Sequence, residues 1–142
     1  MTMPPCIFCD IIRGETPASV VYADEQSIAF MDIQPVVTGH LLVIPRAHAA
    51  SLADLDPDMG AHLFQVGMKL AAALRRSTLR CAGINFFLAD GVEAGQDVFH
   101  VHLHILPRFQ GDNFGFRFPP SYWDLPSRDT LDALAAQVRA AL

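Results

Sequence analysis

Basic residues are scarce in this sequence. Its 142 residues include 10 lysines and arginines against 15 aspartates and glutamates, which gives a formal net charge of -5. Beyond the pair Arg75-Arg76, no cluster of basic residues occurs. Binding to nucleic acid or to an anionic membrane surface needs a basic face that neutralises phosphates. We therefore expect neither nucleic acid nor a membrane among the binding partners.

Long hydrophobic runs and a secretory leader are also lacking. The uncharged stretch from Ile33 to Pro45 is too short to span a bilayer, and it contains Pro35 and Gly39. The N-terminal residues show neither the basic flank nor the apolar segment of a signal peptide. The chain has 3 cysteines, an odd number that does not suggest a secreted disulfide framework. We expect a cytoplasmic protein.

Internal repeats, low-complexity tracts and Ser/Gly linkers are absent as well, so the length fits one domain. Hydrophobic residues make up 51% of the chain, enough for a buried core. Short apolar runs bounded by turn residues predict five strands: Val20–Ala23, Ile28–Asp32, Leu41–Pro45, Ile84–Leu88 and Val98–Leu106. The polar residues between the first two strands are typical of a hairpin turn.

Two helices are predicted by their caps and spacing. The first begins after Asp56, a good N-cap, with Pro57 at its first position. Its apolar residues recur at helical spacing: Met59, Leu63, Val66, Leu70 and Leu74. The second begins after Ser127, with an apolar stripe of Leu131, Leu134, Val138 and Leu142. Together these elements predict an α+β fold with an antiparallel sheet of about five strands.

Histidine is the residue type that stands out. Five of the six histidines lie in or beside predicted strands: His40, His48, His100, His102 and His104. The last three alternate along one strand, so their imidazoles should share a face. His100 and His104 should then lie roughly 13 Å apart, too far to bind one metal ion, so the histidines must divide between tasks. The alternative is a solvated strand face that is merely rich in histidine.

Cys6 and Cys9 form a C-x-x-C motif, which can present two thiolates to one zinc ion. Two histidines would complete such a site. A redox dithiol and a pair of buried cysteines are the alternatives, although a redox motif normally lies between a strand and a helix. Cys81 is expected to be an inert core thiol, and His62 a residue on the flank of the first predicted helix.

The sequence contains neither a Walker A loop nor a G-x-S-x-G motif. Gly91 and Gly95 precede the histidine strand, where glycines allow backbone N–H groups to approach a phosphate. An ordinary hairpin that contains glycine is the alternative. Near pH 7 a neutral imidazole is a competent nucleophile toward phosphorus, and a protonated neighbour can stabilise phosphate oxygens.

These motifs together resemble one known family. The segment Gly91-x-x-Ala94-Gly95-Gln96-x-Val98-x-His100-Val101-His102-Leu103-His104 is similar to the signature of the histidine triad (HIT) nucleotide-binding proteins. Upstream segments follow the same family order: Cys6-Ile7-Phe8-Cys9, Ala29-Phe30-x-Asp32-Ile33 and Gly39-His40-x-Leu42-Val43-Ile44-Pro45-Arg46-x-His48. The resemblance implies a single HIT domain over residues 1–142, with a core at about 6–118, a C-terminal tail and helix at about 119–142, and a dimeric assembly.

The resemblance also implies an enzyme that transfers a nucleoside monophosphate, AMP or GMP, from dinucleoside polyphosphates or nucleoside phosphoramidates. The implied catalytic residues are His102, which forms a covalent nucleotidyl-histidine, His104 and His40, which support phosphate binding and proton transfer, and Gln96, which orients a phosphate. The implied nucleotide contacts are Phe30, Asp32, Ile33, Ala89, Gly95, Gln96, Asp97, Val98, His102 and His104. The implied ligands of a structural Zn²⁺ are Cys6, Cys9, His48 and His100.

Some positions depart from the family pattern. Asp97 stands where many members have Ser or Thr, and its carboxylate would repel an anionic substrate unless it points away. Ala89 stands where the phosphoramidase branch has Asn, and the Trp-Pro-Pro-Gly ending of that branch is missing. The segment around Ala89 and the histidines is more similar to dinucleoside polyphosphate hydrolases. Three alternatives remain open: a regulatory nucleotide-binding protein without turnover, a phosphorolytic nucleotidyltransferase, and a hydrolase with a catalytic zinc.

Overall fold

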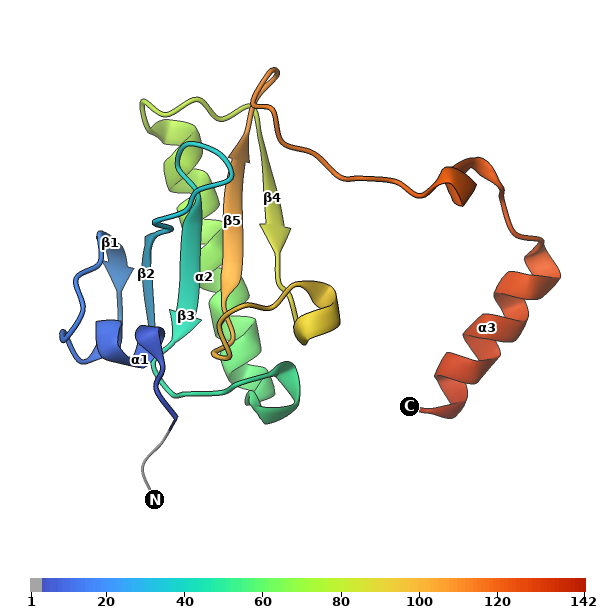
Figure 1. Ribbon diagram of the computed structural model, residues 1–142, viewed down its shortest axis with the longest axis horizontal. Coiled ribbons are helices and arrows are strands. Elements are labelled where there is room, and N and C mark those ends of the chain that lie inside the picture. Colours follow the sequence, from blue (N-terminus) through green and yellow to red (C-terminus); the bar gives the residue numbers. More distant parts are fainter. Residues whose placement is uncertain (1–3) are drawn as a thin grey trace.

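Among residues 4–142, which this computed structural model describes, five antiparallel strands form one sheet (Figure 1). In sheet order they are β1 (Val20–Ala23), β2 (Ser27–Met31), β3 (Leu41–Pro45), β5 (Leu103–Arg108) and β4 (Gly83–Phe87). The helices are α1 (Ile7–Ile12), α2 (Pro57–Arg76) and α3 (Arg128–Ala140), with short 3₁₀ turns at Leu52–Asp54, Val92–Ala94 and Pro120–Trp123. The expected α+β class with an antiparallel sheet is confirmed.

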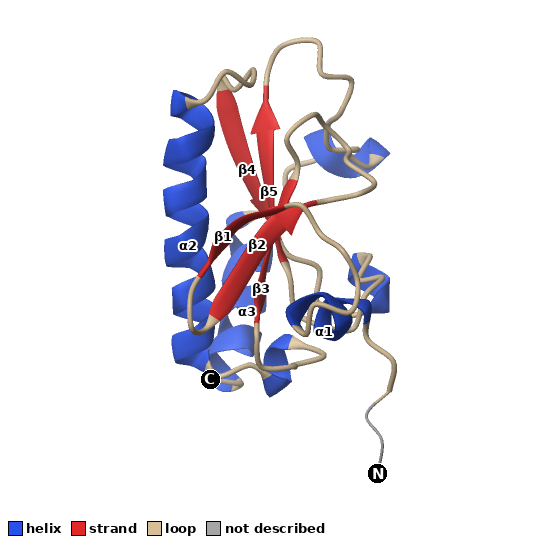
Figure 2. Cartoon of the chain, turned by 90° about the vertical axis from the view of Figure 1, so that its left-hand side faces the viewer, coloured by secondary structure: helices blue, strands red, loops and turns tan. Residues whose placement is uncertain are grey.

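Helix α2 covers one face of the sheet (Figure 2). It begins as the sequence predicts, because the Asp56 side chain accepts a hydrogen bond from the Asp58 N–H and Pro57 follows the cap. Gly67 allows a close approach, since a Cβ at this position would lie 3.0 Å from the Phe86 ring. The core between helix and sheet comprises Leu63, Val66, Leu70 and Leu74 of α2 with Leu41, Val43, Leu103 and Ile105 of the strands. No helix within residues 4–142 has the length and apolar character needed to cross a membrane.

The opposite face of the sheet carries α1 (Figure 2). Phe8, the buried residue of α1, joins a second apolar cluster with Ile28, Phe30, Leu42 and Ile44. The sequence does not predict this helix, because six residues are too few for a periodic pattern. Its position brings the N-terminal cysteines to the face of the sheet where the histidines lie.

The expected bounds of the first four strands agree with the structure to within one residue. The expected strand Val98–Leu106 is wrong over residues 98–102, because β5 begins at Leu103. Within β5, only Leu103–Ile105 pair with β3. The residues before Leu103 form hydrogen bonds outside the sheet, such as the bond from the Val101 N–H to the Ala49 carbonyl at 2.8 Å. His100 and His102 therefore lie in the segment that leads into β5, and only His104 lies in the strand.

The chain beyond β5 runs away from the sheet toward α3 (Figure 1). Helix α3 forms where it was expected, and the Ser127 hydroxyl accepts a hydrogen bond from the Thr130 N–H at its start. Its apolar stripe is exposed in the single chain, with Leu134 at 52% and Val138 at 66% exposure. The amphipathic pattern thus predicts the helix correctly but does not give it a partner within this chain.

Candidate active site and metal centre

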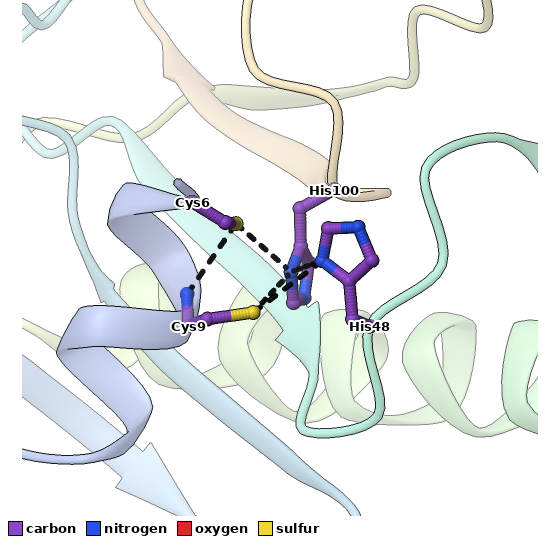
Figure 3. A group of neighbouring side chains, drawn as sticks. All are labelled: Cys6, Cys9, His48 and His100. Atoms are coloured by element: carbon purple, nitrogen blue, oxygen red, sulfur yellow. Dashed lines mark hydrogen bonds between the residues drawn. The ribbon is translucent and has the colours of Figure 1, made fainter. Parts of the chain in front are cut away.

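Two cysteines and two histidines converge at the N-terminal end of α1 (Figure 3). Cys6 is the N-cap of α1 and Cys9 lies in its first turn, so their thiols lie on one side of the helix. His48 follows β3, and His100 precedes β5. One ligand atom from each residue lies within 4.8 Å of all the others. The residues that the sequence resemblance assigns to zinc are thus brought together.

The distances between these atoms fit tetrahedral coordination of one metal ion. The Sγ–Nδ1 distances are 3.5 Å (Cys6–His100), 3.4 Å (Cys9–His48) and 3.6 Å (Cys9–His100), and the two Nδ1 atoms lie 3.1 Å apart. Zinc bonds of about 2.3 Å to sulfur and about 2.05 Å to nitrogen would separate sulfur from nitrogen by about 3.6 Å and the nitrogens by about 3.3 Å. The four residues therefore suit Zn²⁺.

Neighbouring groups prepare the ligands of this cluster. His100 Nε2 donates to the Pro45 carbonyl at 2.8 Å, so its Nδ1 is unprotonated and can bind a metal. Burial, together with the adjacent Cys6 thiol, raises the pKa of the Cys9 thiol. A divalent cation would counter this effect by stabilising two neighbouring thiolates.

Two contacts hold the His102 imidazole in place. Its buried ring places Nδ1 2.8 Å from the carbonyl oxygen of His100. Because a carbonyl oxygen can only accept a hydrogen bond, Nδ1 carries the proton and Nε2 of the neutral ring keeps its lone pair. The Phe8 ring packs edge-on against the imidazole with centroids 5.2 Å apart. These two contacts fix both the tautomer and the direction of the ring.

His40 and His104 form a hydrogen-bonded pair whose protons can be placed in the same way. The Val36 N–H donates to His40 Nδ1 at 3.2 Å, so His40 carries its proton on Nε2. That nitrogen donates to His104 Nδ1 at 2.8 Å, which leaves the His104 proton on Nε2. Burial and the neighbouring imidazoles of His102 and His40 lower the pKa of His104 to about 4, so the ring is neutral near pH 7.

Asp32 lies beside this pair, with Oδ2 3.4 Å from His40 Nε2. Ligand atoms of Asp32, His40 and His104 also lie within 4.8 Å of one another, which makes a second possible metal site. The 2.8 Å between the two ring nitrogens is a hydrogen-bond distance, however, and two nitrogen ligands of one ion would lie about 3.0 Å apart or more. The group is therefore better described as a hydrogen-bonded chain than as a metal site.

A cavity of about 230 Å³ opens in front of His102 and His104. Its walls are mainly apolar, with contributions from Phe30, Met31, Ile33 and Leu42 of the sheet region and Ile7, Phe8 and Ile11 of α1. The carboxylates of Asp32 and Asp97 also line it. Asp97 Oδ1 lies 3.8 Å from His102 Nε2, and its side chain is 83% exposed. The α1 residues are a part of the site that the sequence patterns did not reveal.

Seven of the ten residues implied as nucleotide contacts line this cavity: Phe30, Asp32, Ile33, Asp97, Val98, His102 and His104. Ala89, Gly95 and Gln96 do not line it. The Gln96 amide donates to the carbonyls of Ala50 (2.7 Å) and Val98 (3.1 Å), and its oxygen accepts from the Gly91 N–H (2.8 Å). Gln96 thus holds the glycine loop in shape, and its use in orienting a phosphate stays a prediction.

Known proteins resemble this chain in sequence and in fold. The HIT domain model matches residues 13–111. An uncharacterized HIT-like protein of Borreliella burgdorferi is 45% identical over 116 residues, which cover 81% of this chain and 84% of that protein. The crystal structure of a zinc-bound histidine triad family protein from Mycobacterium smegmatis has a TM-score of 0.75 and 41% identity, covering 96% of this chain and 97% of that one. A histidine triad nucleotide-binding protein from Candida albicans has a TM-score of 0.82 and 29% identity, covering 96% of each chain.

The chain belongs to the HIT family, and the resemblance seen in its sequence is confirmed. This family includes nucleotide-binding proteins and hydrolases.

Proposed function

We propose that this protein cleaves a nucleoside monophosphate from a dinucleoside polyphosphate or a nucleoside phosphoramidate, with a purine nucleotide (AMP or GMP) as the transferred group. One observation carries the proposal: His102, whose Nδ1 bonds to the His100 carbonyl so that Nε2 is directed away from it, borders a cavity that is also lined by Asp32 and by apolar side chains. A buried nucleophile of fixed tautomer is needed for covalent catalysis, whereas a protein that only binds nucleotides does not require it.

In the first step, His102 Nε2 forms a bond to the α-phosphorus. The bond from phosphorus to the leaving atom breaks, and its electron pair stays on the leaving atom. His104 donates a hydrogen bond from its Nε2–H to that atom, and His40 holds the His104 ring through Nδ1. A polyphosphate leaves as the anion, whereas an amine leaves when it is already protonated. In the second step water attacks phosphorus, the bond from phosphorus to His102 Nε2 breaks and leaves a neutral ring, and the proton lost by water passes to solvent. Phosphorolytic transfer would differ only in the acceptor.

The remaining contacts suit a nucleoside monophosphate. We assign the base to the apolar walls formed by Phe30 and Ile33, and the ribose hydroxyls to the Asp32 carboxylate, which accepts hydrogen bonds. The Asp97 carboxylate would repel the phosphate near His102. Because this side chain is largely exposed, it can turn toward solvent when the phosphate binds.

We assign a structural Zn²⁺ to Cys6, Cys9, His48 and His100. The ion would join α1 to the segment that carries His102, and four protein ligands leave no position for a catalytic water. This proposal rests on the fit of the four ligand atoms and on the zinc-bound relative. Because two of the ligands are free thiols, we expect the protein to work in a reducing compartment.

We also propose a homodimer. The exposed apolar stripe of α3 and an apolar hollow on α2 and β4, lined by Phe64, Met68 and Phe86, are surfaces that a second copy could cover. Light scattering during gel filtration should give about twice the 15.5 kDa of one chain. A mass of one chain at micromolar concentration would reject the dimer.

The test of the proposed function is turnover. Wild type and His102→Ala are incubated with diadenosine tetraphosphate and with adenosine 5′-phosphoramidate, and the products are separated by chromatography. We expect AMP from at least one substrate with wild type and a loss of at least a thousandfold in rate with His102→Ala. A nucleotide that binds without turnover would favour the regulatory binding protein. Turnover by His102→Ala that a strong chelator abolishes, without unfolding, would favour a catalytic metal.

A further inference from the structure

A second cavity, of about 260 Å³, shares the His104 side chain with the first. On this side the Phe87 ring lies 5.6 Å from the His104 ring, while the His102 ring lies 4.8 Å from it in the first cavity. Asn85 and Phe87 alternate with Phe86, which packs on Phe64 of α2, so the second cavity also lies on the face opposite α2. Two cavities of similar size thus meet at the His104 ring.

Residues 114–117 form the outer wall of the second cavity, and Arg108 fixes where they begin. Its guanidinium makes two bonds to the Asp112 carboxylate (2.7 and 3.0 Å), one to Asn85 Oδ1 (2.8 Å) and one to the Phe114 carbonyl. The Asp112 carboxylate also accepts from the Phe114 N–H at 3.2 Å. The wall is therefore anchored to β4 and β5.

The two cavities differ in charge. The first is lined by the carboxylates of Asp32 and Asp97. The second, as far as residues 4–142 define it, is lined by no carboxylate and by one permanent cation, Arg117. Within the same residues Arg117 forms no ion pair, so its guanidinium is free for a ligand. Three phenylalanine rings, those of Phe87, Phe114 and Phe116, provide flat apolar surface.

An in-line displacement requires the leaving group to depart on the side of phosphorus away from the attacking His102 Nε2. A leaving group that accepts a hydrogen bond from the His104 Nε2–H is then directed toward the cavity beyond that ring. The guanidinium of Arg117 suits a phosphate, and the aromatic rings suit a nucleobase by stacking. An uncharged or cationic amine would gain nothing from Arg117.

We infer that the second cavity binds the leaving group. Its tail residues Phe116 and Arg117 select a leaving group that carries phosphate groups as well as an aromatic base, such as a nucleoside polyphosphate. This inference rests on the proposed function and narrows it to cleavage of dinucleoside polyphosphates over phosphoramidates. The transferred nucleotide stays in the first cavity in either case.

The test compares kcat/KM for two substrates that share the AMP group and differ in the leaving group. Diadenosine tetraphosphate releases ATP, whereas adenosine 5′-phosphoramidate releases ammonia. We expect Arg117→Ala to lower kcat/KM for diadenosine tetraphosphate by roughly tenfold or more, because a charge-assisted hydrogen bond is lost. Phe116→Ala should lower it about five- to tenfold through lost stacking. Both variants should stay within about twofold of wild type on the phosphoramidate.

Matched controls come from the same tail. Arg128→Ala removes a guanidinium at the start of α3, and Phe118→Ala removes a ring that stacks on Tyr122; neither residue lines the second cavity. Both controls should behave as wild type on both substrates. Equal losses on the two substrates, or no loss with Arg117→Ala and Phe116→Ala, would overturn the inference. A wild type that cleaves only the phosphoramidate would also overturn it and leave the proposed function intact, whereas cleavage of neither substrate would refute both.

Discussion

Phe8→Ala should reduce both stability and turnover, because one ring packs against His100 of the Cys/His cluster and against His102. The Phe8 side chain is 6% exposed and packs edge-on against the rings of Phe30, His100 and His102 at centroid distances of 5.6, 5.8 and 5.2 Å. Truncating a core phenylalanine costs about 3–5 kcal/mol. Helix α1 is short and peripheral and can partly fill the space, so we expect about 3 kcal/mol. In a domain of this size that lowers Tm by roughly 6–12 °C.

The assay is denaturant unfolding, combined with kcat measured where the variant is fully folded. Ile7→Ala is the matched control, since Ile7 lies in the same helix and lines the same cavity but is 45% exposed. It should lose less than about 1 kcal/mol. We expect kcat to fall only in Phe8→Ala, because the His102 ring loses the wall that holds it. Equal losses of stability in the two variants, or an unchanged kcat in Phe8→Ala, would refute this reasoning.

Four further predictions concern His104, the Cys/His cluster, Asp24 and Asp97. Burial lowers the pKa of His104 to about 4, below the roughly 6.5 of an unfolded chain, so the free energy of unfolding should fall as pH drops from about 6.5 to 4; a flat profile would contradict a buried neutral ring. Removal of metal with a strong chelator should lower the Tm of wild type. The Cys9→Ser variant should have a lower Tm from the start, and the chelator should not change it. Burial raises the pKa of Asp24, but hydrogen bonds from Gln26, His62 and Ser27 outweigh this and hold it well below its usual range. Asp24→Asn should therefore lower Tm at pH 7, and the deficit should shrink below about pH 4, as paired thermal scans can check. Asp97→Ser should lower KM for diadenosine tetraphosphate, because it removes a negative carboxylate, 3.8 Å from His102 Nε2, that would repel the substrate's phosphates. An increased KM would show that the carboxylate assists binding.

Local signals account for most of the fold. Asp56 and Pro57 mark the start of α2 because capping and proline geometry depend on a few adjacent residues. Strand bounds at Val20–Ala23 and Leu41–Pro45 follow from short apolar runs between turn residues. The error over residues 98–102 has a physical cause. Alternation continues through them, but the pairing with β3 ends at Val43 and Leu103, although β3 itself continues to Pro45. Pro45 has no N–H to donate, its carbonyl accepts from the His100 ring, and the Val101 N–H donates to the Ala49 carbonyl instead.

The site was only partly predictable, because much of it depends on tertiary contacts. Strand spacing alone indicated that the histidines must serve different tasks, and the structure turns His100 to the cysteines while His102 and His104 face the cavity. The partners Cys6, Cys9 and His48 came from the family resemblance, because their convergence depends on tertiary contacts. The bonds from Arg108 to Asp112 and Phe114 could not be predicted, because they depend on the path that the chain takes after β5.

We propose that His102 becomes covalently nucleotidylated during turnover, and one experiment tests this directly. Wild type and His102→Ala are mixed briefly with diadenosine tetraphosphate, quenched under conditions that preserve a phosphorus–nitrogen bond, and weighed intact by mass spectrometry, with product release followed in parallel. We predict an added AMP group on wild type, located on His102 by fragmentation, and neither adduct nor product with the variant. AMP released by His102→Ala at the wild-type rate would contradict the account.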